Sequence, residues 1–142
     1  MANAVYDDAR NNILGNGTHG QTDWDTDSIK VGLRDEGTTA LNLSTQVDLA
    51  DVSSAHVATS SAVTSPTVGT AATGSFDHAD VTLSAVSGAT VESLDYFEDS
   101  GIASTSPLLL NIDAWTGLPL TPNGGDVTLS PAVTGVFQIA GA

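Results

Sequence analysis

Cysteine is missing from this chain, and only three of its 142 residues are lysine or arginine. Without cysteine there is no disulfide and no thiolate metal site, so packing must hold the fold together. So few basic residues exclude the basic surface that binds nucleic acid or an anionic membrane. We therefore expect no nucleic acid and no membrane among the partners.

Long apolar stretches are missing as well. No segment approaches the roughly 18 apolar residues that cross a bilayer. Residues 1–8 also lack the basic start and the apolar run of a signal peptide. The sequence therefore predicts a soluble protein without an export signal.

Charge of one sign dominates what is present. The 17 acidic residues against three basic ones give a formal net charge of -14. Arg10, Lys30 and Arg34 are the only fixed cations, which leaves most carboxylates without an ion-pair partner. Because about 1 M salt shortens the Debye length to about 3 Å and screens the repulsion, this balance favours a halophilic or marine setting.

Composition and length indicate one β-rich domain. Hydrophobic residues make up 40% of the chain and charged residues 14%, and Ser, Thr, Asn and Gly supply most of the remainder. Such a composition favours strands and turns over long helices. A chain of this length suits one core, so we expect a single domain over residues 1–142.

Periodicity predicts one helix, near the N-terminus. Residues 3–14 carry apolar residues three to four positions apart, with Asn3 as the expected cap and Gly15 as the stop. Residues 47–52 fit one further helical turn.

Alternation predicts the strands. Between residues 28 and 33, Ile29, Val31 and Leu33 share one face, as in a half-buried strand. The Ser- and Thr-rich stretch 53–75 has the composition of a linker, but its β-branched residues favour strands joined by turns. Further strands are predicted at residues 80–84, 94–97, 108–112, 126–130 and 133–139.

Turns and strands together predict the fold class. Segments 80–84 and 126–130 share the pentapeptide Asp-Val-Thr-Leu-Ser, which indicates two similar strands. Residues 121–125, Thr-Pro-Asn-Gly-Gly, predict a tight turn, because Asn-Gly accepts positive φ angles. Seven or eight short strands with a turn about every ten residues predict a β-sandwich or a jelly-roll-like barrel with one short N-terminal helix.

A nucleotide-binding fingerprint occurs once, in the wrong context. Residues 15–20, Gly-Asn-Gly-Thr-His-Gly, match G-x-G-x-x-G, whose mechanism requires a strand before it and a helix after it. Here a predicted helix precedes it and a predicted strand follows. We interpret the match as a helix-to-strand loop and predict no cofactor-binding residues.

Three alternating carboxylates resemble the start of a calcium loop. Asp23, Asp25 and Asp27 have the spacing that converges on a hard cation, but an EF-hand needs Gly at its sixth position and Glu at its twelfth. Ser28 and Arg34 stand there. A solvated acidic turn is the favoured interpretation, and a calcium site of another kind, at an assembly interface, is the alternative.

No pattern of catalytic residues emerges. His19, His56 and His78 lie far apart in the sequence, without zinc-ligand spacing. No G-x-S-x-G motif is present. The sequence therefore predicts no enzyme, no catalytic residues and no resident cofactor.

Aromatic residues are the expected contact residues, since only 5% of the chain is aromatic. Tryptophan and tyrosine are enriched where proteins bind one another. We predict Trp24, Trp115 and Tyr6, the last within the predicted helix, as interface residues.

Five segments resemble small virion proteins of tailed bacteriophages and related archaeal tailed viruses. They are residues 1–7, 24–31, 55–60, 80–88 and 112–128. The last is the most specific, with the sequence Ile-Asp-Ala-Trp-Thr-Gly-Leu-Pro-Leu-Thr-Pro-Asn-Gly-Gly-Asp-Val-Thr. The likeness spans nearly the whole chain. It departs at residues 130–132, where Ser-Pro-Ala replaces an expected strand containing Trp and Asp.

The resemblance implies a structural component of the virion without catalytic residues. Combined with the acidic composition, it leads us to expect a capsid decoration, cement or turret protein on the outer shell. Its partners would be the major capsid protein or other virion proteins, and it would act as a homo-oligomer, with a trimer favoured. A tail, neck or fibre component is the alternative, followed by a host-glycan-binding module.

Overall fold

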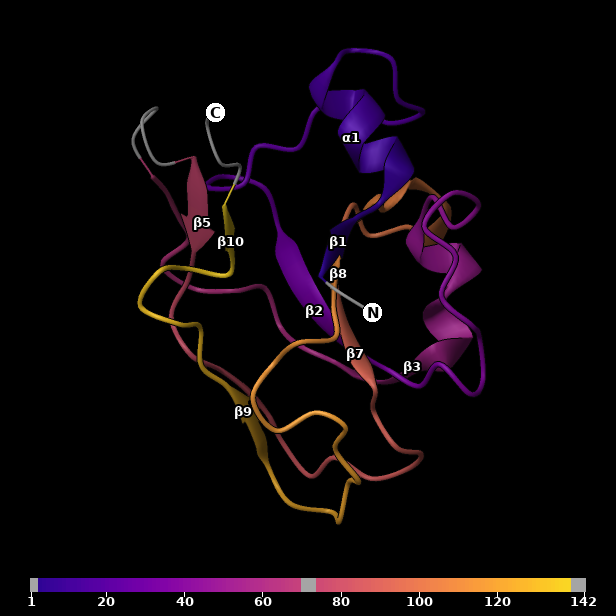
Figure 1. The fold of residues 1–142 in the computed structure, drawn as a ribbon, viewed down its shortest axis with the longest axis vertical. Coiled ribbons are helices and arrows are strands. Elements are labelled where there is room, and N and C mark those ends of the chain that lie inside the picture. The colour runs from indigo at the N-terminus through magenta and orange to yellow at the C-terminus, as the bar shows by residue number, and fades with distance from the viewer. Residues whose placement is uncertain (1–2, 70–73, 139–142) are drawn as a thin grey trace.

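The fold is mainly β, with antiparallel sheets and a single α-helix (Figure 1). A computed structural model describes residues 3–69 and 74–138 of the chain. The predicted mainly β class with one short helix is confirmed, and the sheets are consistent with a sandwich-like arrangement. The described strands form no closed barrel. None of the described helices has the length and apolar character needed to cross a membrane.

Short elements make up the chain. The helices are α1 (Asp7–Ile13) and three single-turn 3-10 helices, η1 (Leu49–Asp51), η2 (Ser53–Ala55) and η3 (Ala103–Thr105). The strands are β1 (Ala4–Val5), β2 (Ile29–Arg34), β3 (His56–Thr59), β4 (Thr67–Val68), β5 (Ser75–Asp77), β6 (Val81–Leu83), β7 (Ser93–Glu98), β8 (Leu108–Ile112), β9 (Val127–Leu129) and β10 (Phe137–Gln138).

The central sheet has the strand order β1-β8-β7-β2-β3. The predicted strand near residues 28–33 is confirmed as β2, and Ile29, Val31 and Leu33 on one of its faces are fully buried. They belong to a single cluster of buried hydrophobic side chains. The strand is not half-buried as predicted, because Gly32 and Arg34 on the other face are buried too. Two smaller sheets, β10-β5-β4 and β6-β9, complete the fold, and β9 lies at the end of the molecule opposite α1 (Figure 1).

Helix α1 starts later than predicted. Tyr6, in an extended conformation, is its N-cap, and Asn3 does not cap it. The preceding residues instead form β1 on the edge of β8, because pairing with that strand satisfies their backbone groups. Gly15 follows the helix with a φ of +76°, the left-handed conformation that glycine adopts readily at a helix end.

The two copies of Asp-Val-Thr-Leu-Ser pair with each other. In the antiparallel ribbon of β6 and β9, Val81 lies opposite Leu129 and Thr82 opposite Thr128. The two threonine hydroxyls are 3.0 Å apart on the exposed face. The prediction of two similar strands is confirmed, and the structure adds that they are partners.

The remaining strand predictions divide. The stretch 53–75 contains β3 and β4 and the start of β5, so strands rather than a linker are confirmed outside residues 70–73, which are not described. The final strand is shorter than predicted. Val133 is 104% exposed in a turn and does not share a buried face with Phe137, because the chain turns at Gly135, whose φ is +90°. Ile139, the last residue assigned to that face, lies outside the described residues.

Candidate functional site

A fully buried carboxylate, Asp95 on β7, is the centre of a polar network inside the fold. Its Oδ1 accepts hydrogen bonds from the hydroxyl of Tyr6, at 2.7 Å, and from Nδ2 of Asn111, at 2.9 Å. Its Oδ2 accepts from Nη1 of Arg34 and from Nε2 of His56, both at 3.0 Å. Four donors on four other segments therefore converge on one carboxylate.

Strand register brings these side chains together. Asp95 lies opposite Asn111 on β8 and opposite Gly32 on β2, while Arg34 lies opposite His56 on β3. Alternate residues of a strand point to opposite faces, so the network occupies the face of the sheet away from Ile29, Val31 and Leu33. Polar residues from four strands thus form a buried layer.

Arg34 also holds the loop that covers this layer. Its Nη2 donates to the carbonyl of Thr39, at 3.0 Å, and to Oε1 of Gln46, at 3.1 Å. Gln46 in turn donates from Nε2 to the carbonyl of Ala40, at 3.0 Å. Since the Arg34 side chain is 0% exposed, its charge is matched inside the protein, by Asp95, and the loop between β2 and η1 is fixed over the sheet.

Burial and charge determine the protonation of the network. Burial by itself raises the pKa of Asp95, but the hydrogen bond from His56 and the positive charge of Arg34 lower it, and the net pKa lies below the usual range. Burial and the negative charge of Asp95 raise the pKa of Tyr6 well above its usual range. Asp95 is therefore a carboxylate and Tyr6 a neutral donor, and both are enclosed where no substrate reaches them.

Acid should weaken the fold through Asp95. Its folded pKa lies below the unfolded value of about 3.9, so the network contributes its full stability above that pH and loses it as the pH falls through the folded pKa. We expect the urea midpoint to fall on acidification below about pH 4, and to fall less in Asp95→Asn. Equal falls in the two proteins would contradict this prediction. Asp8 and Asp35 also have lowered pKa values, so their protonation should still lower the urea midpoint of the variant to some extent.

The three histidines lie in three separate places. His78 donates from Nδ1 to the carbonyl of Ala79, at 2.6 Å, so its Nε2 accepts from the hydroxyl of Tyr96, at 2.9 Å. His19 lies 3.2 Å from Asp8, and His56 belongs to the Asp95 network. Within residues 3–69 and 74–138, no group of three or more His, Asp or Glu side chains is placed to hold a metal ion.

Within the described residues, Asp23, Asp25 and Asp27 form no group placed to hold a metal ion. They lie in the turn before β2, where Oδ2 of Asp27 accepts from the backbone amide of Asp23, at 2.7 Å. The hydrogen bond between the carboxyl groups of Asp23 and Asp25 lowers the pKa of Asp23 and raises the pKa of Asp25. An acidic turn stays the favoured interpretation, and a calcium site stays its untested alternative.

Of the predicted interface residues, Tyr6 is reassigned. It is 0% exposed because its hydroxyl binds the buried Asp95, so its side chain cannot touch a neighbouring molecule. Trp24 is partly buried, with its ring centre 4.7 Å from that of Phe76 and 4.9 Å from that of Phe137. Trp115 is partly buried as well. The two tryptophans line different hollows.

Trp24 lines an apolar groove of about 580 Å³ that α1 forms with β1, β8 and β10. Its rim carries two large exposed side chains, Ile13 at 51% and Leu14 at 81%. Arg10 is the only charged residue among the described residues of its lining. The groove is thus an apolar surface without carboxylates on a strongly acidic protein.

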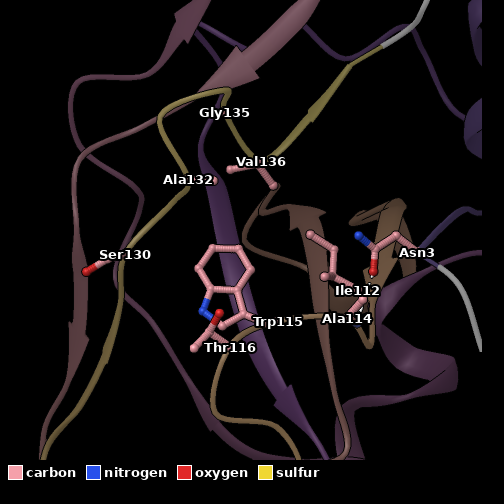
Figure 2. Close-up of a pocket in the computed structure, with 9 residues that line it drawn as sticks. All are labelled: Asn3, Ile112, Ala114, Trp115, Thr116, Ser130, Ala132, Gly135 and Val136. Atoms are coloured by element: carbon pink, nitrogen blue, oxygen red, sulfur yellow. Dashed lines mark hydrogen bonds between the residues drawn. The ribbon is translucent and has the colours of Figure 1, made fainter.

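Trp115 lines a second hollow, of about 310 Å³, shown in Figure 2. Its walls come from the segment before β1, from β8 and the loop after it, and from the chain between β9 and β10. None of the described residues that line it is charged. Both hollows combine residues that lie far apart in the sequence.

The buried network was missed by the sequence patterns. Ser93 and Asp95 alternate with Leu94 and Tyr96 along β7, a pattern typical of a strand with one face in water. The scarcity of basic residues was a usable signal. In a chain with so few of them, an arginine within the fold is a candidate for a buried ion pair with a carboxylate. Arg34 at the end of an apolar strand fits that description.

Comparison with known proteins adds no family. The resemblance to virion proteins therefore stays a prediction. No protein-family model matches the chain, and no curated protein matches it.

Proposed function

We propose that this protein is a structural component of a virus particle, a capsid decoration, cement or turret protein that packs on the outer shell as a homo-oligomer. One observation carries the proposal. The side chains best suited to chemistry, those of Asp95, His56 and Arg34, are enclosed in the fold, whereas the open surface offers an apolar groove. The five segments that resemble virion proteins support the same conclusion.

The groove beside α1 is the surface through which a second copy of this chain binds. Two copies with a net charge of -14 each repel one another. The repulsion is weakest where no carboxylate lines the surface, and none of the described residues that line the groove is acidic. Asp7 lies nearby, but it is paired with Arg10.

Burial supplies the binding energy. Covering one exposed leucine or isoleucine contributes about 1.5 to 3 kcal/mol, and Leu14 and Ile13 both stand open. Specific interfaces bury about 1,200 to 2,000 Å², so the groove is the centre of a larger contact. Salt screens the repulsion between the acidic surfaces around it, and the oligomer is therefore expected to be favoured at high salt.

Polar substitutions at the rim should separate the subunits. We expect the double variant Ile13→Gln/Leu14→Gln to elute as a monomer at concentrations where the unchanged chain is an oligomer, because the contact loses its apolar centre. The measurement is size-exclusion chromatography with light scattering. Both side chains are exposed, so at a dilution where the parent chain is also a monomer the thermal midpoints of the two proteins should be close.

Ile102→Gln is the matched control for that experiment. Ile102 is 63% exposed and lies outside the groove, so its replacement should leave the oligomer intact. A monomeric parent chain at high salt, or equal effects of the control and the rim variant, would contradict the assignment of the groove.

The place of the protein in a particle is tested separately, by cryo-electron microscopy of virions of the virus that encodes this chain. We expect its density on the outer capsid surface in many copies. Density at the tail, neck or fibre in few copies would favour the alternative assignment, and virions without this chain would overturn the proposal.

A further inference from the structure

The hollow beside Trp115 has features that the proposed function does not use. Figure 2 shows Trp115 and Thr116 on one side of it and Asn3, Ile112 and Ala114 on the other. Ser130, Ala132, Gly135 and Val136 close it from the stretch between β9 and β10. At about 310 Å³, it lies at the small end of the range of about 300 to 1,000 Å³ that ligand pockets occupy.

Several polar groups in this hollow are available to a ligand. The indole N–H of Trp115 and the hydroxyl of Thr116 make no hydrogen bond within the described part of the chain, whereas the hydroxyl of Ser130 points away from the other lining residues in Figure 2. The Oδ1 of Asn3 accepts from the backbone amide of Ala114, at 3.0 Å. That bond fixes the amide group and leaves its Nδ2 free to donate, so donors and acceptors lie at several points of the hollow.

The lining is uncharged in a chain that is otherwise strongly acidic. Among the residues that the structure describes, no Asp, Glu, Lys, Arg or His lines the hollow, while the net charge of the chain is -14. An anionic ligand would meet the field of the acidic surface without a cation to pair with, and a cationic ligand would find no carboxylate. The hollow therefore suits a neutral ligand.

A sugar ring fits this combination of features. A pyranose has an apolar face of C–H groups that packs on an aromatic ring, and a rim of hydroxyls that both donate and accept hydrogen bonds. Ile112 and Val136, which are buried, give the hollow apolar walls near the indole. We infer that the Trp115 hollow binds one neutral pyranose unit of a glycan.

Another ligand that packs on tryptophan is an extended proline-rich peptide, and the hollow suits it less well. Grooves for such peptides are lined by several aromatic side chains along an extended surface. Among the described residues, Trp115 is the only aromatic one in this lining, and a proline has no hydroxyls for the free groups of Asn3 and Thr116. The inference does not depend on the proposed virion role.

The test uses the ¹⁵N-labelled full chain, whose two tryptophans give two indole N–H signals in an NMR spectrum. Trp115→Phe identifies the signal of Trp115. The probes are the methyl glycosides of glucose, galactose, mannose and N-acetylglucosamine. We expect at least one of them to shift the Trp115 signal in a saturable way, with a dissociation constant of about 1 to 10 mM. The signal of Trp24, in the other groove, should not move.

Variants of the hollow connect the signal to binding. Thr116→Val removes one hydroxyl of the hollow with little change in volume and should weaken the binding about fivefold. Thr82→Val removes a hydroxyl on the exposed face of β6, outside the hollow, and should leave the binding unchanged. Unaltered affinity in Thr116→Val would overturn the inference.

The choice of probes also separates the ligand classes. N-acetylneuraminic acid, which is anionic, should give no shift. Overturning results are an absence of shifts up to about 100 mM of each neutral glycoside, equal shifts of both tryptophan signals, or a saturable shift with a proline-rich peptide only.

Discussion

Replacing Asp95 with asparagine is expected to lower the free energy of unfolding by about 3 to 5 kcal/mol. Asparagine keeps the shape of the side chain but removes the charge that balances Arg34, whose side chain is 0% exposed. A buried charge without a partner is among the most costly features that a folded protein can contain. One amide group also cannot accept all four of the hydrogen bonds that Asp95 receives.

Urea unfolding at neutral pH, followed by circular dichroism, measures this loss. Asp99→Asn is the matched control, since Asp99 pairs with Lys30 at the end of β7 but both side chains are partly exposed. We expect that control to lose less than about 1 kcal/mol. A similar loss in the two variants, or a loss below about 1 kcal/mol for Asp95→Asn, would contradict a network held by buried charge.

Hydrophobic alternation in the sequence predicted one face of the central sheet correctly. Ile29, Val31 and Leu33 recur at every second position, and such a pattern has one low-energy arrangement, with all three in the core. The opposite face could not be predicted in the same way. It is covered by the loop that Arg34 holds through Thr39 and Gln46, and no local pattern reports whether a distant loop covers a strand.

Strand partnership and the helix start depended on long-range contacts. The pentapeptides of β6 and β9 are identical, and each could form a strand with any partner. Their pairing, which sets Thr82 opposite Thr128, 46 residues later, could not be predicted from the sequence. The residues before α1 have a helical spacing of apolar side chains. They form β1 because the edge of β8 is available to them, and tertiary pairing overrides a short local preference.

The candidate surfaces were less predictable than the strands. Trp24 and Trp115 were recognisable as contact residues by type, but the hollows beside them exist only in three dimensions. Asn3, Ile112, residues 114–116 and four residues between β9 and β10 line one hollow, and nothing in the spacing of these segments indicates that they meet. Tyrosine is also common at interfaces, but Tyr6 is buried. Its hydroxyl binds Asp95, which lies 89 positions away in the sequence.

Adding one methyl group at Gly32 should cost about 2 to 4 kcal/mol. A Cβ on this residue of β2 would lie 2.3 Å from Cε1 and 2.4 Å from Nδ1 of His56. Both distances are too short for contacts between non-bonded atoms of these types. The imidazole would have to move, and Nε2 would leave Oδ2 of Asp95, which it now meets at 3.0 Å. Gly32→Ala therefore combines a packing clash with the loss of a hydrogen bond to a charged group.

The matched control is Gly20→Ala, since a Cβ on Gly20 meets nothing within 4 Å. It should change the free energy of unfolding by less than about 0.5 kcal/mol. Urea unfolding of both variants measures the difference, and His56→Ala identifies its source. If the cost of Gly32→Ala comes from the imidazole, adding it to a chain that already carries His56→Ala should destabilise that chain much less than it destabilises the parent. A full additional loss in the double variant would mean that the residue at position 32 is restricted by the backbone of the sheet and not by the histidine that lies over it.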